Sequence, residues 1–332
     1  LGKGYKSVDF EKKGKQLIFV TGCMIGSAKG DRQRTEYLKL VKQLKWAKYL
    51  LAPKEEPTIP NILLKEGIID EWAIKRIPNH EDIMNPNFGN ETEWAYVNIS
   101  TGCDNFCTFC VVPYARGQEE SRSEAEILRE VKHLANRGFN NIMLVGQNVN
   151  SWGLDRKTKF KIRANSEDKI PFAELLRKVH EIENVKRINF ISSNPFDFTM
   201  DLINTLSLPK IEPYLHIAVQ SGNNEVLTAM NRRHTIEEFK ELINNIKKIN
   251  PNMRFGTDII VGFPNETHDQ FMDTVQLFKD FTFENAYISI YSPREGTNAQ
   301  KMLEDNIPIA EKRERHRILT EVWQDSKIKK EA

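Results

Sequence analysis

From about Tyr96 onward, short apolar segments alternate with amphipathic ones, and this repeat restricts the possible folds more than any other feature. Each apolar segment has the length of a β-strand, and each following segment places its apolar residues at helical spacing. Six strand–helix units in a row predict parallel strands joined by right-handed crossovers. Six units are too few to close an eight-stranded barrel. We therefore expect an α/β fold, an open (βα)6 partial TIM-like barrel, with a flat doubly wound sheet as the alternative. The predicted strands are 96–100, 141–146, 187–192, 214–219, 255–262 and 285–291.

Several helix boundaries in this part of the chain carry their own signals. Thr235 with Glu238, and Thr267 with Gln270, match the capping box that opens a helix. A charged helix over about 308–323 is expected to follow the last strand.

The first 75 residues follow a different pattern, with predicted strands at 16–20 and 49–53. They are predicted to form a small α/β piece that is too short to bury a stable hydrophobic core of its own. Residues 76–95 are rich in Pro and Asn and are predicted to be a linker. The helix between the two strands is predicted to face inward with Tyr37, Leu38, Val41 and Leu44. The expected organisation is an N-terminal α/β domain over 1–75, the linker over 76–95, the barrel over 96–305 and a C-terminal helix over 306–332.

Charge and hydropathy exclude several classes of protein. Lys and Arg number 48 against 46 Asp and Glu, which gives a net charge of +2, so bulk charge does not argue for nucleic acid binding. No apolar run approaches the ~20 residues that cross a bilayer. The N-terminal residues are polar and lack the apolar centre of a signal peptide. We expect a cytoplasmic protein with no membrane partner.

Three of the four cysteines, Cys103, Cys107 and Cys110, have the spacing C-x3-C-x2-C. A chain of this size without a secretory segment does not need disulfides, so metal or redox chemistry is favoured. Three thiolates can hold three irons of a 4Fe–4S cluster and leave the fourth iron open to oxygen and nitrogen donors. The alternative is a three-Cys zinc site completed by a distant histidine such as His216.

Polar or glycine-rich loops follow the other five predicted strands. In parallel α/β folds, ligands bind at the carboxyl ends of the strands. The cysteines follow the first strand and therefore lie at the same edge, which predicts a single site there. The alternative is that such loops are polar in any fold of this class. The five loops are GQNVNSWG, SSNPF, QSGNN, GFPNET and SPREGT.

The cysteine motif after the first strand of a (βα)6 array resembles the radical S-adenosylmethionine superfamily. Five strings, the first of which contains this cysteine motif, resemble in order its methylthiotransferases and more closely the MiaB-type tRNA enzymes. The likeness runs from about Tyr96 to Trp323. CVVPY and GQNVNSW resemble the branch that modifies isopentenyl-adenosine 37 of tRNA. Branches that act on threonylcarbamoyl-adenosine 37 or on a ribosomal protein differ after the second strand. The five strings are GCDNFCTFCVVPYARGQEESR, LVGQNVNSWG, VQSGNNEVLTAMNRRHT, DIIVGFPNET and YSPREGTNA.

The resemblance implies a transferase that adds a methylthio group to C2 of N6-isopentenyladenosine 37 in tRNA through a 5′-deoxyadenosyl radical. Cys103, Cys107 and Cys110 would ligate a 4Fe–4S cluster whose open iron binds S-adenosyl-L-methionine. The implied partners are tRNA and an electron donor such as a flavodoxin-type protein, and the chain is expected to be a monomer. The residues implied for the cofactor are Phe109, Gln220, Ser221, Arg232, Asp258 and Gly262. Among them, Arg232 could pair with the cofactor carboxylate. Those implied for the tRNA are Gln147, Asn148 and Asn150.

Several of these residues could instead have a purely structural role. Phe109 could be ordinary packing, and Arg232 could be a solvated surface residue. The amides of the loop after the second strand could be polar filler.

The sequence also departs from the family pattern. Cys23 in VTGCMIG matches the third of three cysteines that hold an auxiliary 4Fe–4S cluster, and the other two are absent from this sequence. The sequence stops where a small RNA-binding (TRAM-like) domain is expected. Asn194 stands in SSNP where SHP is typical, and Ala218 stands in HIAVQ where HLPVQ is typical. We expect the central piece of a longer methylthiotransferase. The alternatives are a natural short form that cleaves the cofactor without inserting sulfur, and a non-catalytic, metal-stabilised RNA-binding protein.

Overall fold

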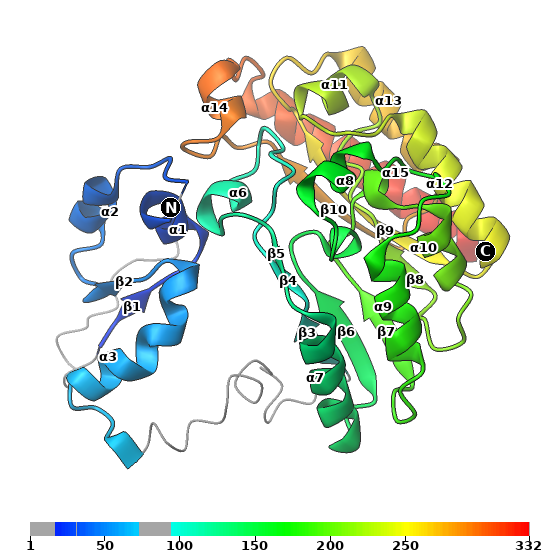
Figure 1. Ribbon diagram of the computed structural model, residues 1–332. Helices are drawn as coiled ribbons and strands as arrows, with labels where there is room; N and C mark the ends of the chain where they lie inside the picture. The colour runs from blue at the N-terminus through cyan, green and yellow to red at the C-terminus, as the bar shows by residue number, and fades with distance from the viewer. Residues whose placement is uncertain (1–16, 31, 73–93, 332) are drawn as a thin grey trace.

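The computed structural model describes residues 17–30, 32–72 and 94–331 (Figure 1). Most of the predicted linker, residues 76–93, lies outside these residues, so that prediction stays a prediction. Its last residue, Ala95, already belongs to a strand.

The six predicted strands of the barrel are present, and all of their mutual pairings are parallel. They pair as two groups, β3-β6-β7 and β8-β9-β10. Single parallel bridges, Ile188–Ile211 and Ser193–Ile217, connect the two groups. The strands are β3 Ala95–Asn98, β6 Asn141–Val145, β7 Arg187–Phe190, β8 Tyr214–His216, β9 Arg254–Val261 and β10 Asn285–Ile290.

The order of the strands distinguishes the two folds that the sequence leaves open. A doubly wound sheet reverses its strand order at a switch point. Here neighbouring strands follow the chain order from β3 to β10 without a reversal, as in a (βα) barrel. Within the described residues, β3 and β10 do not pair with each other. The prediction of an open (βα)6 partial barrel is therefore confirmed.

Helices cover the outer side of the strands (Figure 1). Both predicted capping boxes are present: Thr235 opens α12 and Thr267 opens α13, each with its hydroxyl accepting from the backbone three residues on. The last helix, α15, extends beyond the predicted end and reaches Glu331. The covering helices are α7 Glu124–Asn136, α9 Pro171–His180, α10 Met200–Thr205, α12 Ile236–Ile249, α13 His268–Asp280 and α15 Ile309–Glu331.

The residues of the strands alternate between the helix-covered core and the inner face of the open barrel. On β9, Phe255, Ile259 and Val261 are buried and belong to the main apolar cluster, whereas Asp258 is half-exposed. The same alternation places His216 on the inner face of β8. The core therefore lies between strands and helices, and polar side chains such as those of Asp258 and His216 lie on the inner face.

Within residues 17–30 and 32–65, the N-terminal piece contains two short parallel strands, three short α-helices and a 3-10 helix. Its small core consists of Ile25, Ala28, Leu40, Leu44 and Leu50. The elements are β1 Phe19–Val20, α1 Cys23–Lys29, α2 Tyr37–Gln43, β2 Tyr49–Leu50, a 3-10 helix Pro53–Thr58 and α3 Ile59–Lys65.

The predicted inward face of α2 is partly wrong. Leu38 is 72% exposed and Val41 is 38% exposed, whereas Tyr37, Leu40 and Leu44 contact the core. The apolar residues here allow two helical stripes, and the stripe that contains Leu40 is the one that packs on the core.

The N-terminal piece packs against the segment that carries the three cysteines. α1 lies against α6 Val112–Ala115 so closely that a side chain at Gly26 would stand 2.1 Å from the Ala115 carbonyl oxygen. Arg32 Nη2 donates to Asp104 Oδ1 at 2.9 Å, and the Arg34 guanidinium lies 4.5 Å from the Tyr114 ring centroid. This contact brings Cys23 toward the cysteine segment.

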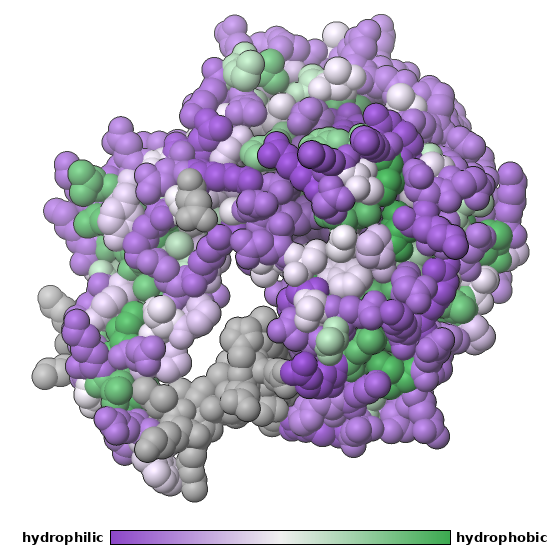
Figure 2. Space-filling view, in the orientation of Figure 1, coloured by the Kyte–Doolittle hydropathy of each residue, from purple (hydrophilic) through white to green (hydrophobic). Residues whose placement is uncertain are grey.

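Hydrophilic residues predominate on the face shown in Figure 2, with small groups of apolar residues between them. None of the helices within the described ranges combines the length and the apolar character needed to cross a membrane.

Candidate functional site

The three cysteines lie in a loop at the carboxyl-terminal side of the first barrel strand. The loop leaves β4 Ser100–Thr101 and returns through β5 Glu120–Ser121, which pairs antiparallel with β4. Gly102 has φ 72°, and a Cβ there would stand 1.9 Å from the Gln118 carbonyl oxygen. The loop therefore closes on itself at a position that tolerates only glycine.

Backbone hydrogen bonds fasten the middle of this loop to the other side of the barrel mouth. Thr108 N donates to the Met230 carbonyl at 3.0 Å, and Ala299 N donates to the Thr108 carbonyl at 2.8 Å. Met230 follows α11 Asn224–Ala229 and Ala299 lies in α14 Asn298–Met302, so loops after β8 and β10 hold the cysteine loop. Segments far apart in sequence thus meet at one rim, as the strand pattern predicts.

All three thiols are free; Cys103 is buried, and Cys107 and Cys110 are half-buried. Burial raises the pKa of Cys103 to about 12 and that of Cys110 to about 11, and the neighbouring Cys107 adds to both increases. Cys23 also contributes to the raised pKa of Cys110, which places it near the loop. A bound metal must therefore displace the thiol protons and supply the positive charge that stabilises the thiolates.

The donor set fits an iron–sulfur cluster better than a single ion. In the part of the chain that the structure describes, no group of three or more His, Cys, Asp or Glu side chains is placed to hold one metal ion. His216, the suggested fourth zinc ligand, lies on β8 with Nε2 3.0 Å from Asp258 Oδ2. A cubane cluster instead takes thiolates at separate corners and needs no convergence on one point.

Of the residues predicted for the cofactor, Phe109 and Gly262 lie around one small apolar cluster. Phe109 is half-buried and packs on the cluster formed by Val226, Met230, Phe263, Tyr291 and Ala299. Gly262 directly precedes Phe263, has φ 67° and donates its N–H to Glu266 Oε2 at 2.7 Å. Phe109 therefore packs on this cluster and remains partly exposed, and its role toward the cofactor stays a prediction.

Gln220, Ser221 and Asp258 lie where β8 continues beside β9. Gln220 has φ 76°, and its N–H donates to the Asp258 carbonyl at 2.9 Å. Ser221 is fully buried, and its Oγ accepts from Asn223 N at 3.2 Å. Of the three side chains, that of Asp258 is the most exposed to the inner face, where it contacts His216.

Arg232 is not the solvated surface residue of the alternative interpretation. Only 9% of it is exposed, and its Nη1 lies 3.4 Å from Cys107 Sγ and 2.9 Å from Asn194 Oδ1. The structure therefore brings this arginine to the cysteine loop.

The three amides predicted for tRNA have different surroundings. Asn148 and Asn150 are fully buried and bond within the protein: Asn150 Nδ2 donates to the Asn194 carbonyl at 2.8 Å, and Asn148 Nδ2 donates to Asp197 Oδ2 at 3.3 Å. Both amides reach a substrate only if these bonds break. Gln147 is half-buried, and its Oε1 has no partner within the described residues.

Sequence reasoning missed Glu119, which ties the cysteine loop to the neighbouring loops. Its Oε2 accepts from the buried Lys159 Nζ at 2.5 Å and from Asp104 N at 3.4 Å. Ser151 Oγ donates to the other carboxylate oxygen. Lys159 lies in α8 Arg156–Lys161, after the loop that follows β6. No spacing rule links residues this far apart, so no sequence signal could have paired them.

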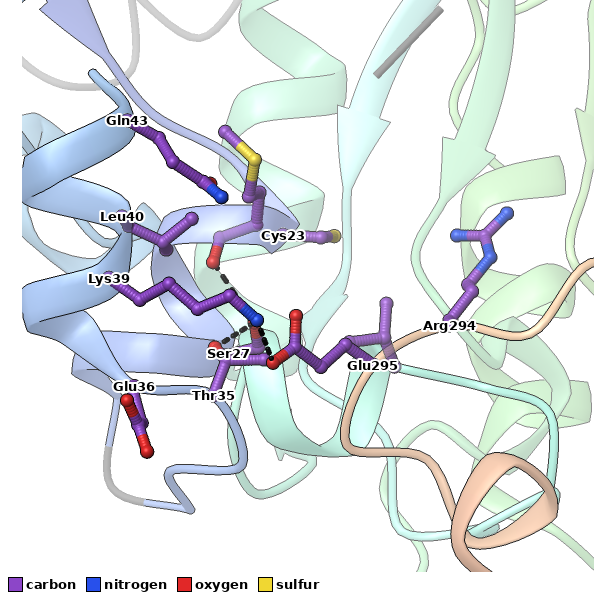
Figure 3. A pocket seen from close by; sticks show the side chains of 11 residues that line it. Cys23, Ser27, Thr35, Glu36, Lys39, Leu40, Gln43, Arg294 and Glu295 are labelled. Carbon is purple, nitrogen blue, oxygen red and sulfur yellow. Dashed lines mark hydrogen bonds and ion pairs between the residues drawn. The ribbon is translucent and has the colours of Figure 1, made fainter.

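A cavity of about 380 Å³ lies between the N-terminal piece and the barrel. Figure 3 shows Cys23 and Lys39 on one side of it and Arg294 and Glu295 on the other, with Lys39 Nζ 3.0 Å from Glu295 Oε1. Val111, next to Cys110, also lines it. Cys23 therefore opens onto a space that reaches the cysteine loop.

Replacing Gly102 by Ala is expected to lower the iron bound per chain after anaerobic reconstitution. The left-handed backbone costs about 1–2 kcal/mol for a residue with a side chain, and the overlap with the Gln118 carbonyl requires the loop to open. Gly138→Ala is the matched control, because Gly138 has φ 92° but open space around it. It should bind iron as the wild type does. Wild-type iron content in Gly102→Ala would contradict this account of the loop.

Residues 97–278 match the Radical SAM superfamily. The chain is 38% identical over 320 residues to a tRNA-2-methylthio-N(6)-dimethylallyladenosine synthase of Anoxybacillus flavithermus, covering 95% of this chain and 57% of that protein. It is 37% identical over 336 residues to the protein of the same name in Thermosipho africanus, covering 94% of this chain and 75% of that protein. The chain thus spans a little over half to three quarters of the length of these curated relatives.

The fold is similar to that of a radical S-adenosylmethionine methyltransferase, TsrM, from Kitasatospora setae, solved with cobalamin and a 4Fe–4S cluster bound. The TM-score is 0.50 at 16% identity, over 62% of this chain and 38% of that chain. At this identity the likeness concerns the fold alone, and it agrees with the open barrel described above.

Proposed function

Because the chain belongs to the radical SAM superfamily, and within it to the methylthiotransferase family of its curated relatives, we propose that it is a tRNA-modifying transferase. The proposed reaction adds a methylthio group to C2 of N6-isopentenyladenosine 37 through a 5′-deoxyadenosyl radical. The observation that carries the proposal is the set of three free thiols in one loop, at a rim formed by the loops after the barrel strands.

Cys103, Cys107 and Cys110 are the proposed ligands of a 4Fe–4S cluster. With S-adenosyl-L-methionine bound, this cluster supplies the one-electron reduction that yields the radical. The protein's own contribution is enclosure and position: the loop is fastened at Thr108 from both neighbouring segments, and Gly102 lets it close tightly. Enclosure excludes water, which would otherwise quench a reactive intermediate.

The remaining assignments of the cofactor pocket are also proposals. Phe109 offers an apolar face, and Gln220, Ser221, Asp258 and Gly262 lie at the adjoining strand ends. Arg232 lies within reach of the cluster ligands. For the tRNA, Gln147 has an unpartnered oxygen, and Asn148 and Asn150 support the loop around it.

Cys23 is the proposed contribution of this sequence to an auxiliary 4Fe–4S cluster expected in the full-length enzyme. It lies near Cys110 and lines the cavity beside the cysteine loop. We also propose the division into domains given above, a flavodoxin-type electron donor, a monomeric state and a cytoplasmic location.

The test is anaerobic reconstitution with iron and sulfide, followed by reduction with S-adenosyl-L-methionine and tRNA that carries isopentenyl-adenosine 37. Formation of 5′-deoxyadenosine together with a methylthio nucleoside, detected by mass spectrometry, is the expected result. Cofactor cleavage without the methylthio product would contradict sulfur insertion by this chain but keep the radical chemistry. A colourless protein with bound zinc would contradict both.

Substrate controls separate the alternatives. tRNA with threonylcarbamoyl-adenosine 37, unmodified tRNA and a ribosomal protein substrate should give no methylthio product. A product with any of them in preference to isopentenyl-adenosine would overturn the proposed substrate.

A further inference from the structure

Arg232 is held in one orientation by acceptors from three separate segments. Nη1 lies 3.4 Å from Cys107 Sγ and 2.9 Å from Asn194 Oδ1, and Nη2 lies 2.6 Å from the Ala218 carbonyl oxygen. The guanidinium also lies 5.1 Å from the centroid of the buried Phe196 ring. Its positive charge is thus fixed beside a thiol in surroundings with little water, where electrostatic interactions are strong.

Asn194 is one of these acceptors, and its own position is fixed by the loop after β6. Its backbone N–H donates to Asn150 Oδ1 at 3.0 Å, and its carbonyl accepts from Asn150 Nδ2 at 2.8 Å. Its side-chain Nδ2 donates to Asn148 Oδ1. Because the amide nitrogen is committed to Asn148, the amide oxygen must face Arg232. A side-chain amide supplies both the donor and the acceptor that this arrangement uses.

Ala218 strengthens the same arrangement through its backbone. Its N–H donates to the Ser193 carbonyl at 3.3 Å, next to Asn194, while its carbonyl accepts from Arg232. A proline at this position could not donate that bond. The two positions at which this sequence departs from the family pattern therefore both contact Arg232 or its support.

We propose that Arg232, oriented by Asn194, is a positioning residue that donates an N–H to the Cys107 thiolate and raises the reduction potential of the cluster. The proposal rests on the cluster of the proposed function but not on the tRNA substrate. A hydrogen bond and a positive charge beside a ligand sulfur stabilise the added electron, and both are established determinants of iron–sulfur potentials. This role differs from pairing with the cofactor carboxylate, which the resemblance implies for the same arginine.

The test is a redox titration of the reconstituted protein without S-adenosyl-L-methionine or tRNA. The EPR signal of the reduced cluster measures the fraction reduced at each potential. Arg232→Gln should lower the midpoint potential, with a tenfold change in the reduction equilibrium corresponding to about 59 mV for one electron. Asn194→Ala keeps the arginine and all the thiols, and it should shift the potential in the same direction by a smaller amount.

Arg163→Gln is the matched control for loss of charge. Arg163 is exposed and donates to the backbone carbonyls of Phe160 and Ile162. Its replacement should leave the potential unchanged. A shift equal to that of Arg232→Gln would show that net charge, not the bond to Cys107, sets the potential.

A second readout separates the two roles of Arg232. If this residue serves only the cofactor carboxylate, Arg232→Gln weakens binding of S-adenosyl-L-methionine and leaves the cofactor-free potential unchanged, which would overturn the proposal. Unchanged potentials in both Arg232→Gln and Asn194→Ala would overturn it as well, as would a wild-type chain that binds no cluster. A missing methylthio product would instead contradict the proposed function alone, because the titration needs no tRNA.

Discussion

Replacement of Cys107 by Ala is expected to reduce 5′-deoxyadenosine formation to the level measured without protein. Cys103, Cys107 and Cys110 are the only cysteines of the barrel loop, and two thiolates leave two irons without a protein ligand. The substitution also takes away the sulfur next to the buried guanidinium of Arg232. Members of such a unit do not contribute additively, so one loss removes nearly the whole effect. The measurement is deoxyadenosine released per chain, with bound iron and sulfide determined on the same sample.

Thr108→Ala is the matched control for this result. Thr108 is adjacent to Cys107, and its side-chain Oγ1 donates to the Ala229 carbonyl at 2.9 Å. The backbone bonds that fasten the loop do not depend on that side chain. The control should keep its cluster and most of its activity. Equal activity in Cys107→Ala and the wild type would refute the cluster assignment.

The barrel could be predicted because its signals are local. Alternation along a strand, a stripe along a helix and a capping box each involve residues within a few positions of one another. The capping residues Thr235 and Thr267 therefore appear where the sequence places them. The prediction of the inward face of α2 was partly wrong because it used local signals alone. Local periodicity allowed two stripes, and only packing against the core around Ile25 decides between them.

In the candidate site, too, the local features could be predicted and the long-range contacts could not. The spacing of the cysteines is local and identifies the loop. The link from Asn148 through Asn194 to Arg232 and Cys107 joins residues that are 46, 38 and 125 positions apart. No sequence pattern specifies such contacts, because they depend on how the loops after different strands meet at the rim. Arg232 consequently could not be distinguished from a surface arginine before its burial was known.

Replacement of Arg315 by Met is expected to lower the free energy of unfolding by about 3–5 kcal/mol, the usual cost of leaving one member of a buried ion pair alone. Arg315 Nη1 lies 2.7 Å from Glu266 Oε2, and the two side chains are only 5% and 1% exposed. The same carboxylate oxygen accepts the N–H of Gly262 at 2.7 Å. Loss of the arginine therefore leaves a buried carboxylate beside the end of β9 and loosens α15 from the barrel.

Arg317→Met, two residues further along α15, is the control that isolates burial. Arg317 pairs with Glu314 and Glu321, but all three side chains are more than half exposed. Exposed pairs of this kind contribute little to stability, so no measurable change is expected. Both variants are compared with the wild type by urea denaturation, with circular dichroism as the measure of unfolding. Equal urea midpoints for Arg315→Met and Arg317→Met would show that the Glu266–Arg315 pair does not hold α15 on the barrel. The apolar contacts of Leu319 with the main core would then be what holds this helix.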